Sequence, residues 1–116
     1  MENPALGTPD PARIVWPDYE PATDAQIALG RQLFFEPRLS RDGTMSCATC
    51  HDPAIGWADG MATTRGHRGK ILHRNTPGLT NVAFGSIFYW DGRAASLEEQ
   101  ALGPLTNPDE MALTRE

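Results

Sequence analysis

The residues with the clearest chemical potential are the two cysteines and the histidine of Cys47-Ala48-Thr49-Cys50-His51. Two thiols three positions apart on one helical turn can each add to a vinyl group of the same porphyrin. The histidine that follows then directs its imidazole at the iron. The spacing therefore predicts one covalently attached haem c, held by Cys47 and Cys50, with His51 as the proximal iron ligand.

The same cysteines could instead form a thioredoxin-like redox pair or bind zinc. A thioredoxin-like pair needs the motif to follow a strand in a βαβ setting, and the sequence has no such pattern. His67 and His73 follow Cys50 at a distance near that of a Cys2His2 zinc site, although the interval is slightly too long. Zinc would leave His51 without a role, so haem is the preferred interpretation.

The second axial position of the iron decides between electron transfer and catalysis. A sulfur ligand favours an electron carrier, whereas a displaceable ligand permits chemistry at the iron. A lone methionine is more often core packing, and from the residues alone a solvent-facing loop histidine is the simpler interpretation of His67. However, His67 lies between Gly66 and Gly69, which leave the backbone free to move. The sequence candidates are Met45, Met61, Met111, His67 and His73.

Short helices joined by long loops must position these residues, because 11 glycines and 10 prolines occur among 116 residues. Five prolines in residues 1–22 block regular helix and predict an extended N-terminal arm. Residues 23–116 have the length of one small domain. Within it, Thr23 and Gln26 have the pattern of a capping box for a helix that ends at about Phe35.

The remaining elements are predicted from capping and turn residues. Residues 47–51 should form a short helix, and residues 52–75 a long irregular segment of the kind that is usually functional or disordered. Three later helix starts carry capping residues or flanking prolines. They are Asn75 or Thr76 with Pro77 following, Ser96 with Glu99 in a capping box and Gly103-Pro104 as the end, and Asn107-Pro108.

Charge and hydropathy argue against some classes of protein. The net charge of −5 at pH 7 lacks the basic excess of a nucleic-acid-binding protein. No apolar run reaches the length of a membrane span, and the N-terminus has no secretory signal. Haem c is attached outside the bacterial cytoplasm, so we expect the signal to have been removed or to lie in a longer reading frame.

A longer pattern of motifs extends over residues 25–112. Its parts are Leu29-Gly30-Arg31-Gln32-Leu33-Phe34-Phe35, Pro37-Arg38-Leu39-Ser40, Gly43-Thr44-Met45-Ser46 before the cysteine motif, Arg74-Asn75-Thr76-Pro77, Asn81-Val82-Ala83-Phe84, Trp90-Asp91-Gly92-Arg93, Glu99-Gln100-Ala101, Gly103-Pro104, Asn107-Pro108 and Glu110-Met111. In order and spacing it resembles the N-terminal domain of bacterial di-haem cytochrome c peroxidases and the related MauG proteins. The resemblance implies an all-α, cytochrome c-like domain wrapped around haem.

The resemblance also implies roles at the iron. His51 would be the proximal ligand of a low-potential, peroxidatic haem. His67 matches a distal ligand that leaves the iron on activation, and His73 is the alternative at that position. Gln100 and Glu110 match the polar residues of the peroxide pocket, where a carboxylate can move a proton between the two oxygens.

Two further residues match family positions away from the iron. Trp90 matches a tryptophan between the two haems, and Asn75 a residue near a calcium site at the interface with a second domain. Without the resemblance, Trp90 is a core residue beside a turn, Asn75 is a helix cap and Glu110 only favours a helix N-terminus.

The implied function is reduction of hydrogen peroxide to water in the periplasm, with electrons from a small c-type cytochrome or a cupredoxin. Family members are longer, carry a second Cys-x-x-Cys-His motif and can form homodimers. This chain has two cysteines, so we expect a fragment of a two-domain protein that turns over peroxide poorly by itself. Two alternatives stay open: a mono-haem electron-transfer domain with His51 and Met111 as ligands, and a MauG-like haem enzyme that oxidises residues of another protein.

Overall fold

The computed structural model describes residues 9–114, so the first eight residues of the predicted arm lie outside it. The described chain is helical with little strand: three α-helices, several single 3-10 turns and three isolated β-bridges. The α-helices are α1 (Asp24–Phe34), α2 (Cys47–Cys50) and α3 (Leu97–Thr106). The 3-10 turns are η1 (Pro11–Arg13), η2 (Pro17–Tyr19), η3 (Pro37–Leu39), η4 (Pro53–Ile55), η5 (His67–Gly69) and η6 (Val82–Phe84).

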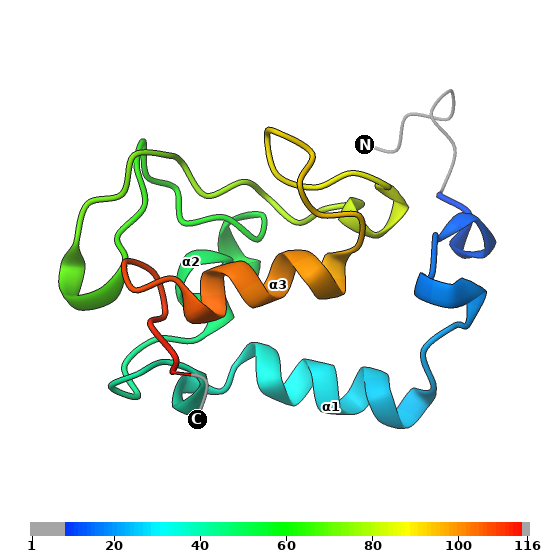
Figure 1. The fold of residues 1–116 in the computed structure, drawn as a ribbon, viewed down its shortest axis with the longest axis horizontal. Helices are drawn as coiled ribbons and strands as arrows, with labels where there is room; N and C mark the ends of the chain where they lie inside the picture. The colour runs from blue at the N-terminus through cyan, green and yellow to red at the C-terminus, as the bar shows by residue number, and fades with distance from the viewer. Residues whose placement is uncertain (1–8, 115–116) are drawn as a thin grey trace.

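Long loops account for most of the molecule. In Figure 1, α1 forms one edge, the loops between α2 and α3 lie along the opposite edge, and α3 lies between them in this view. No helix within residues 9–114 is long and apolar enough to cross a membrane. In the arm, residues 14–17 line a shallow groove together with Phe88 and Leu97, so this part of the arm lies against the domain.

Helix α1 begins where the sequence predicts. The Thr23 amide donates to Oε1 of Gln26 (2.8 Å), and the Gln26 amide donates to Oγ1 of Thr23 (3.2 Å), which is a complete capping box. The helix ends at Phe34, and the Phe35 amide closes its last turn on Gln32. The predicted helix is therefore confirmed at both ends.

The predicted helix after Asn75 or Thr76 is wrong. Residues 75–79 have no helical structure, and only the single turn η6 follows. The Thr76 hydroxyl is buried and donates to Oδ2 of Asp59 (3.1 Å), so it joins two distant parts of the loop instead of capping a helix. Asn81, just before η6, has a left-handed backbone (φ 61°) that interrupts any helix arriving from the N-terminal side.

The predicted end of α3 at Gly103-Pro104 is also wrong, because the helix continues to Thr106 with Pro104 inside it. Its start is as predicted, since Oγ of Ser96 accepts the Glu99 amide (3.1 Å). The Glu99 carboxylate accepts the Ala95 amide rather than the Ser96 amide, so the second hydrogen bond of the predicted capping box is shifted by one residue. A proline in a helix leaves the carbonyl four residues earlier without its donor, and here Tyr89 supplies the replacement for Gln100.

The predicted helix start at Asn107-Pro108 is a tight turn. The Asn107 carbonyl accepts the amides of Glu110 (3.0 Å) and Ala112 (2.9 Å), and its side chain accepts the Asp109 amide (3.0 Å). Ala112 has a left-handed backbone (φ 58°), which stops a helix from continuing. The result is a short, well-bonded turn that directly follows α3.

The apolar core built by the described residues is small. Its buried members are Met45, Ala94, Met111 and Ala112, and no large side chain within residues 9–114 is fully buried. Large apolar side chains remain exposed on α1 and the loops, among them Ile27, Leu29, Leu33, Phe35, Ile55, Trp57, Met61 and Ile71. A small domain of this kind benefits from a large apolar cofactor that adds to its core.

Candidate functional site

The cysteine motif forms the single helical turn that its spacing predicts. The Ser46 amide donates to Oγ1 of Thr49 (2.9 Å) at the start of α2, and the His51 amide donates to the Cys47 carbonyl (2.9 Å) at its end. Both thiols are free and half-buried. They therefore lie on one turn, with His51 directly after them.

The environment of the thiols disfavours a redox pair. Burial raises the pKa of Cys47, and burial together with the charges of Asp59, Glu110 and Cys47 raises the pKa of Cys50 to about 11. A reactive redox cysteine needs a lowered thiol pKa, and no strand precedes the motif within the described residues. The zinc alternative lacks support as well, since His, Cys, Asp and Glu side chains in residues 9–114 form no group of three or more that could hold a metal ion.

The imidazole of His51 is oriented for metal binding through Nε2. Its Nδ1 lies 2.9 Å from the main-chain carbonyl oxygen of Trp57. A carbonyl can only accept, so Nδ1 carries the proton and the lone pair is left on Nε2. The turn that presents this carbonyl is closed by the Trp57 amide on the Asp52 carbonyl (2.8 Å) and by the Asp52 amide on Ala58 (3.1 Å).

Two thiols on one turn, an oriented imidazole and exposed apolar side chains together fit haem c. The donor set is that of a covalently attached haem with one histidine ligand. The Trp57 ring also packs edge-on against Phe34 of α1, with centroids 5.7 Å apart, so the turn beside His51 is tied to the first helix.

His67 lies in a tight loop at residues 65–71, which is closed by the Gly66 amide on the Lys70 carbonyl (2.8 Å) and by a bridge between Arg65 and Ile71. Its side chain is only 13% exposed, so the solvent-facing interpretation of His67 is wrong. His73, by contrast, is exposed. The geometry therefore favours His67 over His73 as a side chain that faces the interior.

The inward ring of His67 faces Asp42. Nδ1 of His67 is buried, lacks a hydrogen-bond partner within residues 9–114 and lies 3.7 Å from Oδ2 of Asp42. The other Asp42 oxygen accepts the Thr44 hydroxyl (2.6 Å) and the Thr44 amide (3.2 Å). These hydrogen bonds lower the pKa of Asp42, and the nearby His67 adds a smaller effect in the same direction.

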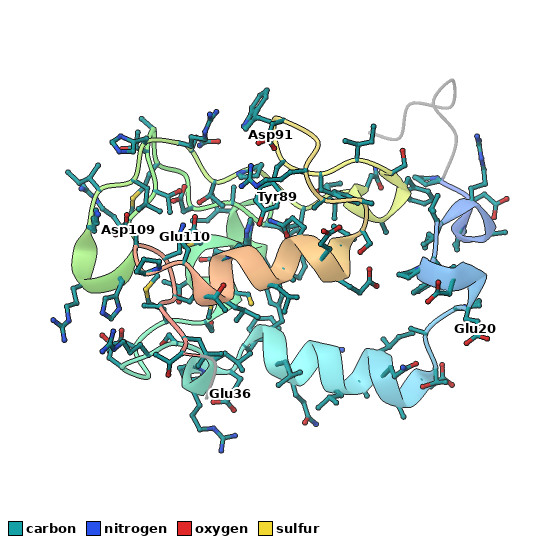
Figure 2. All side chains as sticks on the ribbon, viewed as in Figure 1. Glu20, Glu36, Tyr89, Asp91, Asp109 and Glu110 are labelled. Atoms are coloured by element: carbon teal, nitrogen blue, oxygen red, sulfur yellow. The ribbon has the colours of Figure 1, made fainter. Side chains whose placement is uncertain are left out.

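Gln100 and Glu110 are both half-buried and come from α3 and the turn after it. Burial raises the pKa of Glu110, the charge of Asp109 raises it further, and Arg93 opposes the change. Because the charge of Glu110 also raises the pKa of Cys50, the carboxyl lies within electrostatic range of the haem-attachment turn. Figure 2 shows Asp109 and Glu110 just beyond the end of α3, with Asp109 beside the loop of residues 65–71.

Trp90 and Asn75 lie outside this group. Trp90 is 89% exposed at a loop tip, with the Arg74 guanidinium 6.0 Å from its ring centroid, so the core interpretation is wrong. Asn75 is exposed and donates to the Met61 carbonyl (2.8 Å) instead of capping a helix. Met111 is 5% exposed, as the core-packing interpretation predicts.

Sequence reasoning missed Asp42 and Asp109 as neighbours of His67. Asp42-Gly43 indicated only a turn, although the spacing of Asp42 and Thr44 is that of a side chain that accepts from the backbone two residues later. Asp109 gave no signal, because its contacts are with a loop about forty residues earlier in the chain.

Comparison with known proteins places these residues in a family context. The di-haem cytochrome c peroxidase family matches residues 24–116. MauG of Methylorubrum extorquens is 50% identical over 104 residues, which cover 90% of this chain and 30% of MauG. Cytochrome c551 peroxidase of Pseudomonas aeruginosa is 43% identical over 110 residues, which cover 95% of this chain and 32% of that protein.

Two solved structures are similar to this chain in fold as well as in sequence. A MauG-like protein associated with microbial copper homeostasis superposes with a TM-score of 0.74 and 32% identity, over 83% of this chain and 31% of that one. The di-haem peroxidase BthA of Burkholderia thailandensis superposes with a TM-score of 0.70 and 35% identity, over 79% and 27%. The chain thus spans just under a third of the length of these relatives.

Proposed function

Because the chain belongs to the di-haem cytochrome c peroxidase family, we propose that it is the domain at which such an enzyme reduces hydrogen peroxide to water. The electrons would come from a small c-type cytochrome or a cupredoxin in the periplasm. The observation that supports this proposal is the half-buried Glu110, a candidate acid–base group whose pKa is raised by burial and whose charge acts on Cys50 of the haem-attachment turn.

Cys47, Cys50 and His51 would hold the haem. The thiols would form thioethers to it, and Nε2 of His51 would bind its iron, since Nδ1 is engaged by Trp57. The haem supplies a redox-active iron at which the peroxide O–O bond is broken.

Glu110 would move the proton and Gln100 would hold the substrate. Reduction of one peroxide consumes two electrons and two protons and yields two waters. A carboxylate can take the proton from one peroxide oxygen and deliver it to the other, which then leaves as water. A raised pKa suits this role, because the carboxylate is then a stronger base than that of an ordinary glutamate and takes the peroxide proton more readily.

His67 would be the distal ligand that binds and leaves the iron. Its support is a largely buried ring on a loop that contains two left-handed residues, Arg68 (φ 52°) and Gly69 (φ 76°). The exposed Trp90 would serve as an electron path toward the second haem, and Asn75 would contribute to calcium binding at the interface with the second domain. Homodimer formation would be a property of the longer protein.

A MauG-like oxidation of protein residues is the second candidate, because the MauG relative is 50% identical over 104 residues. Both functions would use the same haem and the same pocket in this domain. They differ in whether the oxidising equivalents pass to a donor protein's metal centre or to side chains of a protein substrate. Peroxide-dependent covalent modification of a partner, detected by mass spectrometry, would favour the MauG-like reaction.

Spectra of the ferric haem-loaded chain test the ligand assignment. We expect a low-spin spectrum with two histidine ligands, and conversion to high spin in His67→Ala. Met111→Ala is the matched variant for the electron-transfer alternative and should leave the ligation unchanged. Loss of the sixth ligand in Met111→Ala, with unchanged spectra in His67→Ala, would replace the peroxidase proposal by an electron-transfer domain.

A further inference from the structure

The loop that carries His67 is fastened to the turn after α3 at a single residue, Asp109. The Asp109 carbonyl accepts the His67 amide (2.9 Å), and its carboxylate pairs with Nζ of Lys70 (2.5 Å). Gly66 allows the approach, since a Cβ there would lie 1.9 Å from the Asp109 carbonyl oxygen. Gly66, His67 and Lys70 of this loop therefore all lie against Asp109, which follows about forty positions later in the chain.

Of these two segments, the turn after α3 is held more firmly than the loop of residues 65–71. Asn107 holds the Asp109 amide through its side chain (3.0 Å) and the Glu110 amide through its carbonyl (3.0 Å). The Met111 carbonyl accepts the Arg41 amide (2.9 Å), which ties the turn to a segment near the cysteine motif. Bonds on both sides of Asp109 thus fix its position and that of the next residue, Glu110.

The loop, by contrast, has features of a movable element. Gly66 and Gly69 have no side chains, and Arg68 and Gly69 have left-handed backbones. The inward Nδ1 of His67 makes no hydrogen bond within residues 9–114 and only faces Asp42 at 3.7 Å. Within residues 9–114, one long contact reaches the loop from the cysteine motif, from the Cys50 thiol to the Arg65 carbonyl (3.9 Å). Apart from this contact and the loop's own closure, its main-chain and side-chain hydrogen bonds to the rest of the domain go to Asp109.

We propose that Asp109 is a positioning residue that clasps the His67 loop to the turn carrying Glu110. The clasp couples the placement of the iron ligand to that of the acid–base group, because the two groups are bonded to the same turn. Movement of His67 away from the iron would break the His67 amide bond and the Lys70 ion pair together. This inference rests on the proposed function in taking His67 as the distal ligand and Glu110 as the acid–base group.

The alternative is that Lys70 and Asp109 form an ordinary surface ion pair that does not affect the stability of the loop. Lys70 and Asp109 are 54% and 46% exposed, and isolated exposed pairs contribute little to stability. The clasp differs because the ion pair lies beside a main-chain hydrogen bond to the same residue, so the two support each other. Weakening the pair should therefore speed opening of the loop by about two- to fivefold.

Amide hydrogen exchange of the haem-loaded chain tests the clasp directly. Asp109→Asn removes the charge and keeps the main-chain carbonyl, and Lys70→Met keeps the length of the side chain. Both should speed exchange of the His67 amide by about two- to fivefold relative to the wild type. The matched control is Glu36→Gln, which removes a carboxylate from an ion pair with the exposed Arg38, two residues away, and should leave this amide unchanged.

The charge-swapped double variant, Lys70→Asp with Asp109→Lys, should restore slow exchange. The ferric spectra of Asp109→Asn should show more high-spin haem than the wild type. Exchange in Asp109→Asn and Lys70→Met that matches the Glu36→Gln control would overturn the clasp. Faster exchange with unchanged spectra, in a protein whose spectra do respond to His67→Ala, would overturn its coupling to the iron ligand.

Failure of the proposed function would give a different experimental result from failure of the clasp. If His67→Ala leaves the spectra unchanged, the assignment of His67 as an iron ligand is wrong. The exchange rates still decide whether Asp109 fastens the loop, because they do not depend on what His67 binds.

Discussion

The hydroxyl of Tyr89 donates to the main-chain carbonyl of Gln100 (2.9 Å), which is the carbonyl that Pro104 leaves without a helical donor. Gly103 makes room for this contact, because a Cβ there would lie 1.9 Å from the Tyr89 hydroxyl oxygen. The Arg93 guanidinium covers the Tyr89 ring at 3.5 Å from its centroid. A side chain from the preceding loop (Figure 2) thus completes α3 at the residue proposed to hold peroxide.

Tyr89→Phe should destabilise the haem-loaded protein by about 1 kcal/mol, because it leaves the Gln100 carbonyl without a donor. Urea denaturation would measure the loss. The matched control is Thr106→Val, which removes a hydroxyl that donates to the Leu102 carbonyl (2.8 Å). That carbonyl keeps the Thr106 amide as its helical donor, so the control should lose less. Equal losses in the two variants would mean that the Tyr89 bond has no special role.

Gly103→Ala should destabilise more than Tyr89→Phe, since its Cβ would overlap the Tyr89 hydroxyl. The control is Gly30→Ala in the middle of α1, where a Cβ meets nothing within 4 Å. It should stabilise the protein by roughly 0.5–1 kcal/mol through helix propensity. Tyr89→Phe combined with Gly103→Ala should cost less than the sum of the two single changes. Strict additivity in thermal or urea unfolding would contradict a shared contact.

The contact between Tyr89 and Gln100 shows why one part of this fold could not be predicted from the sequence. The capping box of α1 and the turn at Cys47–Cys50 depend on residues within a few positions of each other, and both are present as predicted. The end of α3 depends on Tyr89, which lies fifteen residues before Pro104, so local rules place it too early. Long-range contacts of this type are invisible to capping and propensity arguments.

The residues of the site also divide into those fixed by local sequence and those fixed by long-range contacts. Cys47, Cys50 and His51 are adjacent in sequence, so their chemistry could be inferred from spacing alone. The placement of His67 could not, because its ring faces Asp42 and its main-chain amide donates to Asp109, and these two residues lie on either side of it in the chain.

The Glu36–Arg38 pair gives the stability of the protein a defined dependence on pH. Hydrogen bonds from the Arg38 side chain and amide lower the pKa of Glu36 from 4.5 to about 2. A lowered folded-state pKa means that the unfolded state binds the proton more readily. The contribution is therefore fully present above pH 4.5 and is lost as the pH falls toward 2.

Urea denaturation of wild type and Glu36→Gln across this range would check the prediction. The wild type should be the more stable protein above pH 4.5, and the difference should shrink as the pH is lowered. Arg38 is 86% exposed, so the difference should also decrease with added salt. An advantage of the wild type that grows toward pH 2 would have the wrong sign for a lowered pKa.

Glu110→Gln should slow the reaction of the reduced, haem-loaded chain with peroxide by about a hundredfold or more, the usual contribution of a positioned acid–base group. Glutamine keeps the size of the side chain and removes its ability to take a proton, so spectra and haem content should not change. Stopped-flow mixing under single-turnover conditions measures this step without a second haem or a donor protein. Glu98→Gln is the matched control, because Glu98 is exposed in the first turn of α3 and should react like the wild type. Equal rates in Glu110→Gln and Glu98→Gln would show that the half-buried carboxyl takes no part in moving the peroxide proton.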